Sequence, residues 1–157
     1  MQRICLFPGT FDPITLGHTD IIDRSLDLFD GIVVGIGVNA AKAPMFPVEQ
    51  RLAWIREIYK DQPRVKALAY EGLTVKCCRD IGARYILRGI RSFTDFEYEK
   101  AIAEVNRMMD PSIETYFLHS SPNVGTLAST LVRDVIRNGG DASRLVPAAV
   151  LHTVKKP

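Results

Sequence analysis

The amino-acid sequence predicts an α/β domain built on a five-stranded parallel β-sheet with helices on both faces. Short apolar runs alternate along the chain with longer segments in which apolar residues recur every three or four positions. Continuous apolar runs are typical of strands buried on both faces, and the longer period is typical of amphipathic helices. Alternation of the two favours parallel strands joined by right-handed crossovers. A length of 157 residues suits one domain, spanning residues 1–157, with a sizeable core.

Each expected strand is followed by an expected helix. The strands are placed at residues 4–7, 31–38, 65–69, 85–87 and 114–118. The first helix carries Ile22, Leu26 and Phe29 on one face. The later helices are expected to begin at Pro47, at Leu73, at Thr94 or Asp95, after Ser129 as N-cap, and at Pro147. Glycine or proline is expected to end three of them, at Gly82, at Asp110-Pro111 and at Gly139-Gly140.

The spacing of apolar residues shows which of them share a helix face. Trp54 widens the apolar stripe of the second helix, so we expect it to be buried. The fourth helix carries apolar residues that share one face, namely Tyr98, Ile102, Val105 and Met109. Met108 and Met109 are expected to pack at the end of that helix. Three cysteines make no disulfide framework and are expected to be small buried residues, Cys5, Cys77 and Cys78.

Composition and charge exclude several classes of function. The 20 basic and 18 acidic residues give a net charge of +2, which provides no argument for nucleic acid or a membrane surface. No apolar run approaches the ~18 residues that cross a bilayer, and no signal-peptide pattern is visible, so a cytoplasmic protein is expected. The histidines stand apart from one another and from the cysteines, which argues against a structural zinc site, and no metal ligand is predicted.

The strand–loop–helix junction at residues 8–18 is the strongest candidate for a binding site. It joins the first strand to the first helix, and a helix N-terminus offers free backbone N–H groups and partial positive charge to an anion. Gly9 and Gly17 allow close approach of backbone and ligand, Thr10 adds a hydroxyl, and His18 lies in the first helical turn. The alternative is an ordinary turn with a surface histidine.

Three further loops follow the carboxyl ends of strands, where ligands bind in parallel sheets. They are residues 39–46, 88–92 and 120–130. Lys42 could follow the charge of a phosphate, or be an exposed surface lysine. Arg88 and Arg91 could fork onto phosphate oxygens, or pair with Asp95 or Glu97. Ser129-Thr130 open a second helix N-terminus. Arg133 and Arg137 could reach the same site or face solvent.

The sequence lacks the motifs of nicotinamide-cofactor oxidoreductases, of P-loop kinases and of enzymes with a serine nucleophile elbow. The chain has no GxGxxG after its first strand, no GxxxxGK[ST] and no GxSxG. No cysteine has an evident base, so no nucleophile stands out. Phosphoryl and nucleotidyl transfer need none, because positioning and charge neutralisation carry most of the catalysis.

Three segments, PGTFDPITLGH (residues 8–18), RGIRSFTDFEYE (88–99) and STLVRD (129–134), resemble the bacterial phosphopantetheine adenylyltransferases of the nucleotidylyltransferase superfamily. The resemblance implies a Rossmann-like fold and adenylyl transfer from ATP to 4′-phosphopantetheine, giving dephospho-coenzyme A and pyrophosphate in coenzyme A biosynthesis. It also implies Mg²⁺ and a homohexamer. Residues 124–128 depart from the family pattern, because they lack its aromatic and serine-rich character.

The resemblance also implies roles for individual residues. Those of the catalytic step would be His18, Lys42 and Arg91, with His18 stabilising charge in the transition state. Residues that bind phosphopantetheine would be Thr10, Lys42, Leu73, Thr74 and Arg88. Residues that bind ATP would be Thr10, Phe11, His18, Gly89, Ile90, Arg91, Glu99, Val124, Gly125, Thr126, Leu127, Ala128, Ser129 and Thr130. Without the resemblance, Glu99 would be a solvated helix residue.

Two alternative functions stay open at this point. A related enzyme could use another acceptor, such as nicotinamide mononucleotide or glycerol phosphate, although Thr15 in place of a second histidine argues against it. A nucleotide sensor could keep the loops and lack turnover.

Overall fold

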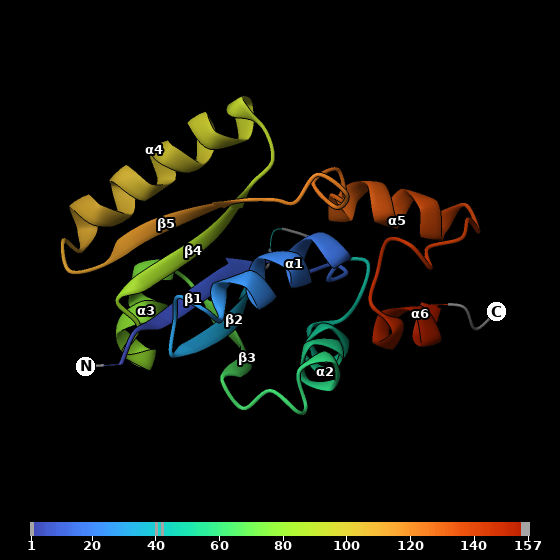
Figure 1. Cartoon of the computed structure of the whole chain (residues 1–157), viewed down its shortest axis with the longest axis horizontal. Helices are drawn as coiled ribbons and strands as arrows, with labels where there is room; N and C mark the ends of the chain where they lie inside the picture. Colours follow the sequence, from blue (N-terminus) through green and yellow to red (C-terminus); the bar gives the residue numbers. More distant parts are fainter. Residues whose placement is uncertain (1, 40, 42, 155–157) are drawn as a thin grey trace.

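Five strands form one parallel sheet in the order β3-β2-β1-β4-β5 (Figure 1). The computed structural model describes residues 2–39, 41 and 43–154. The strands are β1 (Ile4–Gly9), β2 (Gly31–Val38), β3 (Val65–Glu71), β4 (Tyr85–Ile90) and β5 (Glu114–His119). The chain runs outward from β1 to β3 and then returns to the other side of β1 for β4 and β5. The strand order therefore switches between β1 and β4, where open α/β sheets leave a crevice for ligands.

The predicted alternation of strands and helices is confirmed. The helices are α1 (Leu16–Ser25), α2 (Val48–Ile58), α3 (Thr74–Ile81), α4 (Phe93–Met109), α5 (Ser129–Arg137) and α6 (Ala148–Val154). Within the described ranges, none of these helices combines the length and the apolar character needed to cross a membrane.

Several helix ends differ from the prediction by a residue or two, and two of the differences bear on packing. α1 ends at Ser25, so Leu26 and Phe29 lie beyond it, although Phe29 still packs in the core. Ser129 is not an N-cap: Ala128 occupies that position, and the Ser129 hydroxyl donates instead to the carbonyl of Pro13 at 2.9 Å. The serine therefore ties α5 to the loop after β1 rather than capping its own helix.

The core lies on both faces of the sheet, because successive residues of a strand point to opposite sides. Cys5 and Phe7 of β1 face a large cluster that includes side chains from α1, α2, α5 and α6. Leu6 faces a smaller cluster that includes side chains from α3, β2 and β4. Trp54 and the three unpaired cysteines are buried, as predicted.

The prediction that Met108 and Met109 pack at the end of α4 is wrong, and the apolar face that they border is exposed. Tyr98 is 69% exposed and Met108 is 83% exposed, and Val105 and Met109 are exposed as well. The face of α4 that turns inward instead carries Glu99 and Asn106, which are both buried. Helical periodicity identifies which residues share a face, but it does not say which face meets the sheet. α4 accordingly lies along β5 at one side of the molecule with an apolar surface exposed (Figure 1).

Candidate functional site

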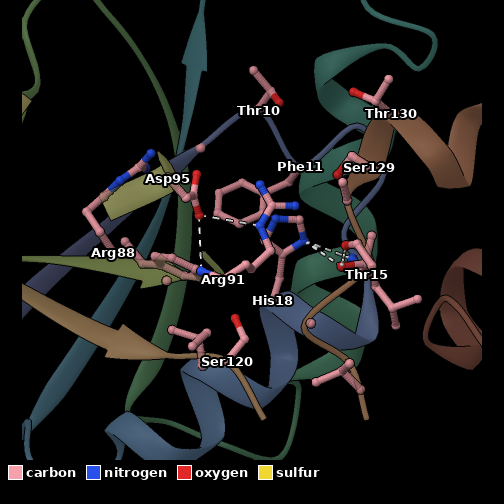
Figure 2. A pocket seen from close by; sticks show the side chains of 18 of the residues that line it. Thr10, Phe11, Thr15, His18, Arg88, Arg91, Asp95, Ser120, Ser129 and Thr130 are labelled. Carbon is pink, nitrogen blue, oxygen red and sulfur yellow. Dashed lines mark hydrogen bonds and ion pairs between the residues drawn. The ribbon is translucent and has the colours of Figure 1, made fainter. Parts of the chain in front are cut away.

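A cavity of about 260 Å³ opens at the carboxyl ends of β1 and β4 (Figure 2). Its walls come from residues 7–11, the first turns of α1, the β4–α4 junction and residues 120–130. A neighbouring cavity joins Thr10 and Thr130 to Asn39 and Pro44 of the loop after β2. The predicted convergence of four loops on one edge of the sheet is therefore confirmed.

The loop after β1 is held by buried charged groups from distant segments. The guanidinium of Arg51 donates to the carbonyl of Thr10 at 2.7 Å, and that of Arg133 donates to the carbonyl of Asp12 at 2.7 Å. The Asp12 carboxylate accepts the backbone N–H groups of residues 45 and 46, each at 2.9 Å. Arg133 therefore faces the site rather than solvent. Sequence reasoning missed Arg51 and Asp12, because nothing in their local pattern distinguishes a buried ion from a surface one.

The surroundings of His18 favour a neutral ring with one defined tautomer. Its Nδ1 accepts the backbone N–H of Thr15 at 3.0 Å, and the Thr15 hydroxyl lies 3.1 Å from the same nitrogen. Because Nδ1 must accept, the proton of the neutral ring belongs on Nε2. Desolvation, followed by the positive charges of Arg91 and Arg88, lowers the His18 pKa to about 4. His18 is thus a neutral donor at neutral pH. A polar residue at the N-cap with a hydrogen-bonding partner three positions later is a capping-box spacing, and this signal could have identified Thr15.

Gly17 brings the start of α1 against residues 124–127. A Cβ atom at Gly17 would lie 3.0 Å from the carbonyl oxygen of Val124, so a larger residue would push the two segments apart. The Thr15 hydroxyl also donates to the carbonyl of Leu127 at 3.2 Å. The unusual segment is therefore anchored to the same helix end that holds His18.

Each arginine at the β4–α4 junction is paired with a carboxylate of α4. The guanidinium of Arg88 donates to both oxygens of Glu99, with Nε 2.7 Å from Oε2, and it also donates to the carbonyl of Pro8. Glu99 is only 6% exposed, so the residue-based expectation that it is solvated is wrong. Arg91 lies 3.5 Å from Asp95, which is the ion pair that the sequence offered as the alternative to phosphate binding, and both arginines also line the cavity.

The N-terminus of α5 presents unbonded N–H groups beside the cavity. The first backbone bond of the helix runs from the N–H of Val132 to the carbonyl of Ala128. Across the described chain, no hydrogen bond is formed by the N–H groups of residues 129–131, and Ser129 and Thr130 line the cavity. Such a helix end favours an anion.

A further cavity of about 510 Å³ shares Thr10 and Arg88 with the first, and we call it the second cavity. It reaches across Thr74, Ile102 and Asn106, and the Thr74 hydroxyl lies 3.1 Å from that of Tyr70. Thr10 and Arg88 consequently stand where two ligands could meet.

The structure brings most of the predicted residues together. The first cavity is lined by Thr10, Phe11, His18, Arg88, Gly89, Arg91, Glu99, Val124, Leu127, Ala128, Ser129 and Thr130, and Thr74 lines the second. Ile90, Gly125, Thr126 and Leu73 line neither cavity, and Leu73 is 57% exposed. Lys42 lies outside the described residues. Contacts of all these residues with a ligand stay predictions.

Comparison with known proteins agrees with this geometry. Residues 6–135 match the cytidylyltransferase-like family. The chain is 55% identical to a phosphopantetheine adenylyltransferase of Flavobacterium psychrophilum, over 95% of this chain and 98% of that protein. It is 41% identical to one of Lachnoclostridium phytofermentans, over 98% and 94%.

A solved structure shows the same fold. It is a Vibrio parahaemolyticus protein described as a nicotinate-nucleotide adenylyltransferase, with a TM-score of 0.75 and 20% identity, covering 99% of this chain and 100% of that one. At that identity the match concerns the fold alone. The extent of the sequence matches confirms the resemblance predicted from the three segments, and the chain belongs to the phosphopantetheine adenylyltransferase family.

Proposed function

We propose that this chain transfers the adenylyl group of ATP to 4′-phosphopantetheine, releasing pyrophosphate and forming dephospho-coenzyme A in coenzyme A biosynthesis. Family membership supports this choice of reaction. The observation that carries it is the state of His18: a neutral ring with Nδ1 occupied and Nε2–H available, in a cavity lined by two arginines and a helix N-terminus. That set of donors suits phosphate groups that exchange partners without a protein nucleophile.

The acceptor phosphate would bind at the point that the two cavities share. We place it on Thr10 and Arg88, with Lys42 as a further ligand from outside the described residues, and the pantetheine arm along Thr74 toward exposed Leu73. A phosphate oxygen attacks the α-phosphorus, the new P–O bond forms, and the bond to the β-phosphate oxygen breaks. The electron pair leaves with pyrophosphate, and no protein group needs to take a proton.

His18 would donate Nε2–H to the α-phosphate as its charge is redistributed. A donor held in advance of the reaction stabilises the transition state without reorganisation, an effect worth about 2.7–4 kcal/mol for one such group. Arg91, Ser129 and Thr130, with the free N–H groups of α5, would hold the β- and γ-phosphates.

The remaining predicted residues would form the nucleoside side of the site. Phe11, Gly89, Val124, Leu127 and Ala128 line the cavity directly. Ile90, Gly125 and Thr126 adjoin residues that line the cavity, and they would act by setting the course of the backbone there. Glu99 would act on the ligand through Arg88, which it orients.

We propose that Mg²⁺ arrives with ATP. The described ranges contain no cluster of three His, Cys, Asp or Glu side chains able to cage a metal ion. Mg²⁺ usually keeps several waters and binds through substrate phosphates, so the residues present fit an ion carried by the triphosphate. When bound, it would neutralise charge on the leaving phosphates.

We also propose that the chain forms a homo-oligomer through the outer face of α4, defined by Tyr98, Ile102, Val105 and Met109. A contiguous exposed apolar surface of this kind is typical of an interface. The hexamer that the resemblance implies is the expected size. Val105→Asp should dissociate the assembly in light-scattering chromatography, whereas Leu28→Asp, at an exposed apolar residue far along the chain, should leave it intact. An unchanged mass for Val105→Asp would remove α4 as the interface.

The cytoplasm is the proposed site of action, because three free buried thiols suit a reducing compartment.

Pyrophosphate release tests the proposed reaction. The protein is supplied with ATP, Mg²⁺ and one acceptor: 4′-phosphopantetheine, nicotinamide mononucleotide or glycerol 3-phosphate. Release with phosphopantetheine alone is expected. Release with another acceptor alone would overturn the acceptor assignment, and ATP binding without release would favour a sensor.

A further inference from the structure

The hydroxyl of Ser120 forms no hydrogen bond with the residues that the structure describes, and it is open to the first cavity. Ser120 lies directly after β5, is 5% exposed and lines the first cavity. Throughout the described part of the chain, no side chain or backbone group hydrogen-bonds its Oγ, and Figure 2 shows the hydroxyl on the side of His18 and Arg91. Among the described residues no buried side-chain oxygen or nitrogen lacks a partner, so this hydroxyl is reached from the cavity, where water satisfies it until a ligand takes the place of that water.

The backbone around Ser120 is fixed on both sides. Its own N–H donates to the carbonyl of Ile90 at 2.9 Å. The N–H and the hydroxyl of Ser121 both donate to the Asp20 carboxylate of α1, at 3.1 and 2.8 Å. Arg24 donates to the carbonyl of His119 at 2.9 Å and to Asp20 at 3.1 Å. We call this set of bonds the Asp20 clasp. The clasp holds the backbone of the turn and leaves the Ser120 hydroxyl free to bind a ligand.

The surroundings of Ser120 suit the uncharged part of a nucleotide. A Cβ atom at Gly89 would lie 3.9 Å from Ser120 Oγ, and one at Gly125 would lie 3.7 Å from Ser120 Cβ, so both glycines border the Ser120 side chain. Ile21 also lines the cavity and packs against Gly89. The free N–H groups of α5 attract phosphate, and they lie beside Ser129 and Thr130, which Figure 2 shows apart from Ser120. The part of the cavity beside Ser120 is therefore left for the nucleoside.

We propose that Ser120 recognises the nucleoside of the bound nucleotide through a hydrogen bond from its hydroxyl, and that the Asp20 clasp positions it to do so. The inference rests on the proposed function in taking ATP as the nucleotide. It does not depend on which acceptor is used.

The test compares Ser120→Ala with the unchanged protein on ATP and on analogues that each lack one hydrogen-bonding group of the nucleoside. The analogues are 2′-deoxy-ATP, 3′-deoxy-ATP, the triphosphate without the 6-amino group, and the 1-, 3- and 7-deaza forms. We expect Ser120→Ala to lower kcat/KM for ATP by about 3–10-fold, the range for one net hydrogen bond. That loss should disappear with the analogue that lacks the partner of Ser120. KM for the acceptor should not change.

Ser112→Ala is the matched control, because Ser112 precedes β5 at its opposite end and its exposed hydroxyl donates to Asp110. It should show no loss on any nucleotide. An equal loss of Ser120→Ala on every analogue, or no loss on ATP, would overturn the proposal. Calorimetric Kd values for the same nucleotides without acceptor give the same comparison and need no turnover. If the proposed transfer reaction fails, the role of Ser120 in binding the nucleoside can therefore still be tested.

Discussion

The β1–α1 and β4–α4 junctions both lead from a strand's carboxyl end into a helix, yet they prepare opposite kinds of donor. The first presents His18, whose ring is kept neutral by a backbone N–H on Nδ1 and by its surroundings. The second presents two permanent cations, Arg88 and Arg91, each held by a carboxylate one or more turns along α4. The two junctions meet in one cavity.

The difference shows how one junction sets the chemistry of the other. The positive charges of Arg91 and Arg88 are among the causes that lower the His18 pKa. A cationic histidine would add charge, but it would also repel the arginines that bind phosphate. A neutral donor beside paired cations avoids this conflict and keeps the donor in place for the reaction.

His18→Ala breaks the comparison at its first junction and should have the largest effect on activity. We expect kcat to fall about 10²–10³-fold, because a preorganised donor to the reacting phosphate is lost. KM for ATP should change little, since the arginines and α5 remain. Steady-state kinetics measure both values. His152→Ala, at an exposed histidine of α6, is the control. An equal loss through KM would assign His18 to binding instead.

Glu99→Ala breaks the second junction. It leaves the partly buried Arg88 guanidinium without its carboxylate, and breaking a buried ion pair from one side lowers the free energy of unfolding by about 3 kcal/mol. KM for the acceptor should also rise, because Arg88 loses its orientation. Chemical denaturation and kinetics test the two effects. Glu97→Ala, an exposed residue of the same helix, should change neither. A fully stable Glu99→Ala variant would contradict the buried pair.

A pH titration sharpens the contrast between a neutral and a charged donor. The unfolded chain binds a proton at His18 near pH 6.5, whereas the folded chain does so only near a pKa of about 4. The unfolded state therefore holds more protons between these values, and stability falls as pH decreases from about 6.5 to about 4. The loss should be about 2 kcal/mol for this partly exposed ring.

His18→Gln supplies the reference, because it lacks the titrating group. The difference in unfolding free energy between the unchanged protein and this variant should shrink as the pH is lowered. A difference that is constant with pH would mean that the folded and unfolded pKa values of His18 are alike.

Asp95→Asn should have the smallest effect on stability and activity. It shows whether the exposed Arg91–Asp95 pair differs in strength from the buried Arg88–Glu99 pair. The Arg91 side chain is 43% exposed and that of Asp95 is 23% exposed, so removing this charge should change stability by less than about 1 kcal/mol. KM for ATP should rise by about 2–5-fold, within what one exposed ion pair contributes. A destabilisation as large as that of Glu99→Ala would show that exposure does not distinguish the pairs.

The sequence by itself determined the alternation of strands and helices and the four loops that meet at the site. Periodicity is a local property, and the connection rules of parallel sheets bring the carboxyl ends of the strands to one edge. It also carried the three segments that resemble the family, and so predicted His18, Arg88 and Arg91 as a group.

Only the tertiary structure decided which charges pair and which faces are exposed. The partners of Asp12 lie 33, 34 and 121 residues away, and Ser121 reaches Asp20 across 101 residues. No local pattern specifies such contacts. The same holds for α4, where one periodic pattern is compatible with an inward or an outward apolar face. In the structure the face of α4 that carries Glu99 meets Arg88, and the apolar face is outward. A buried carboxylate requires a partner cation, and only the fold brings Arg88 to it.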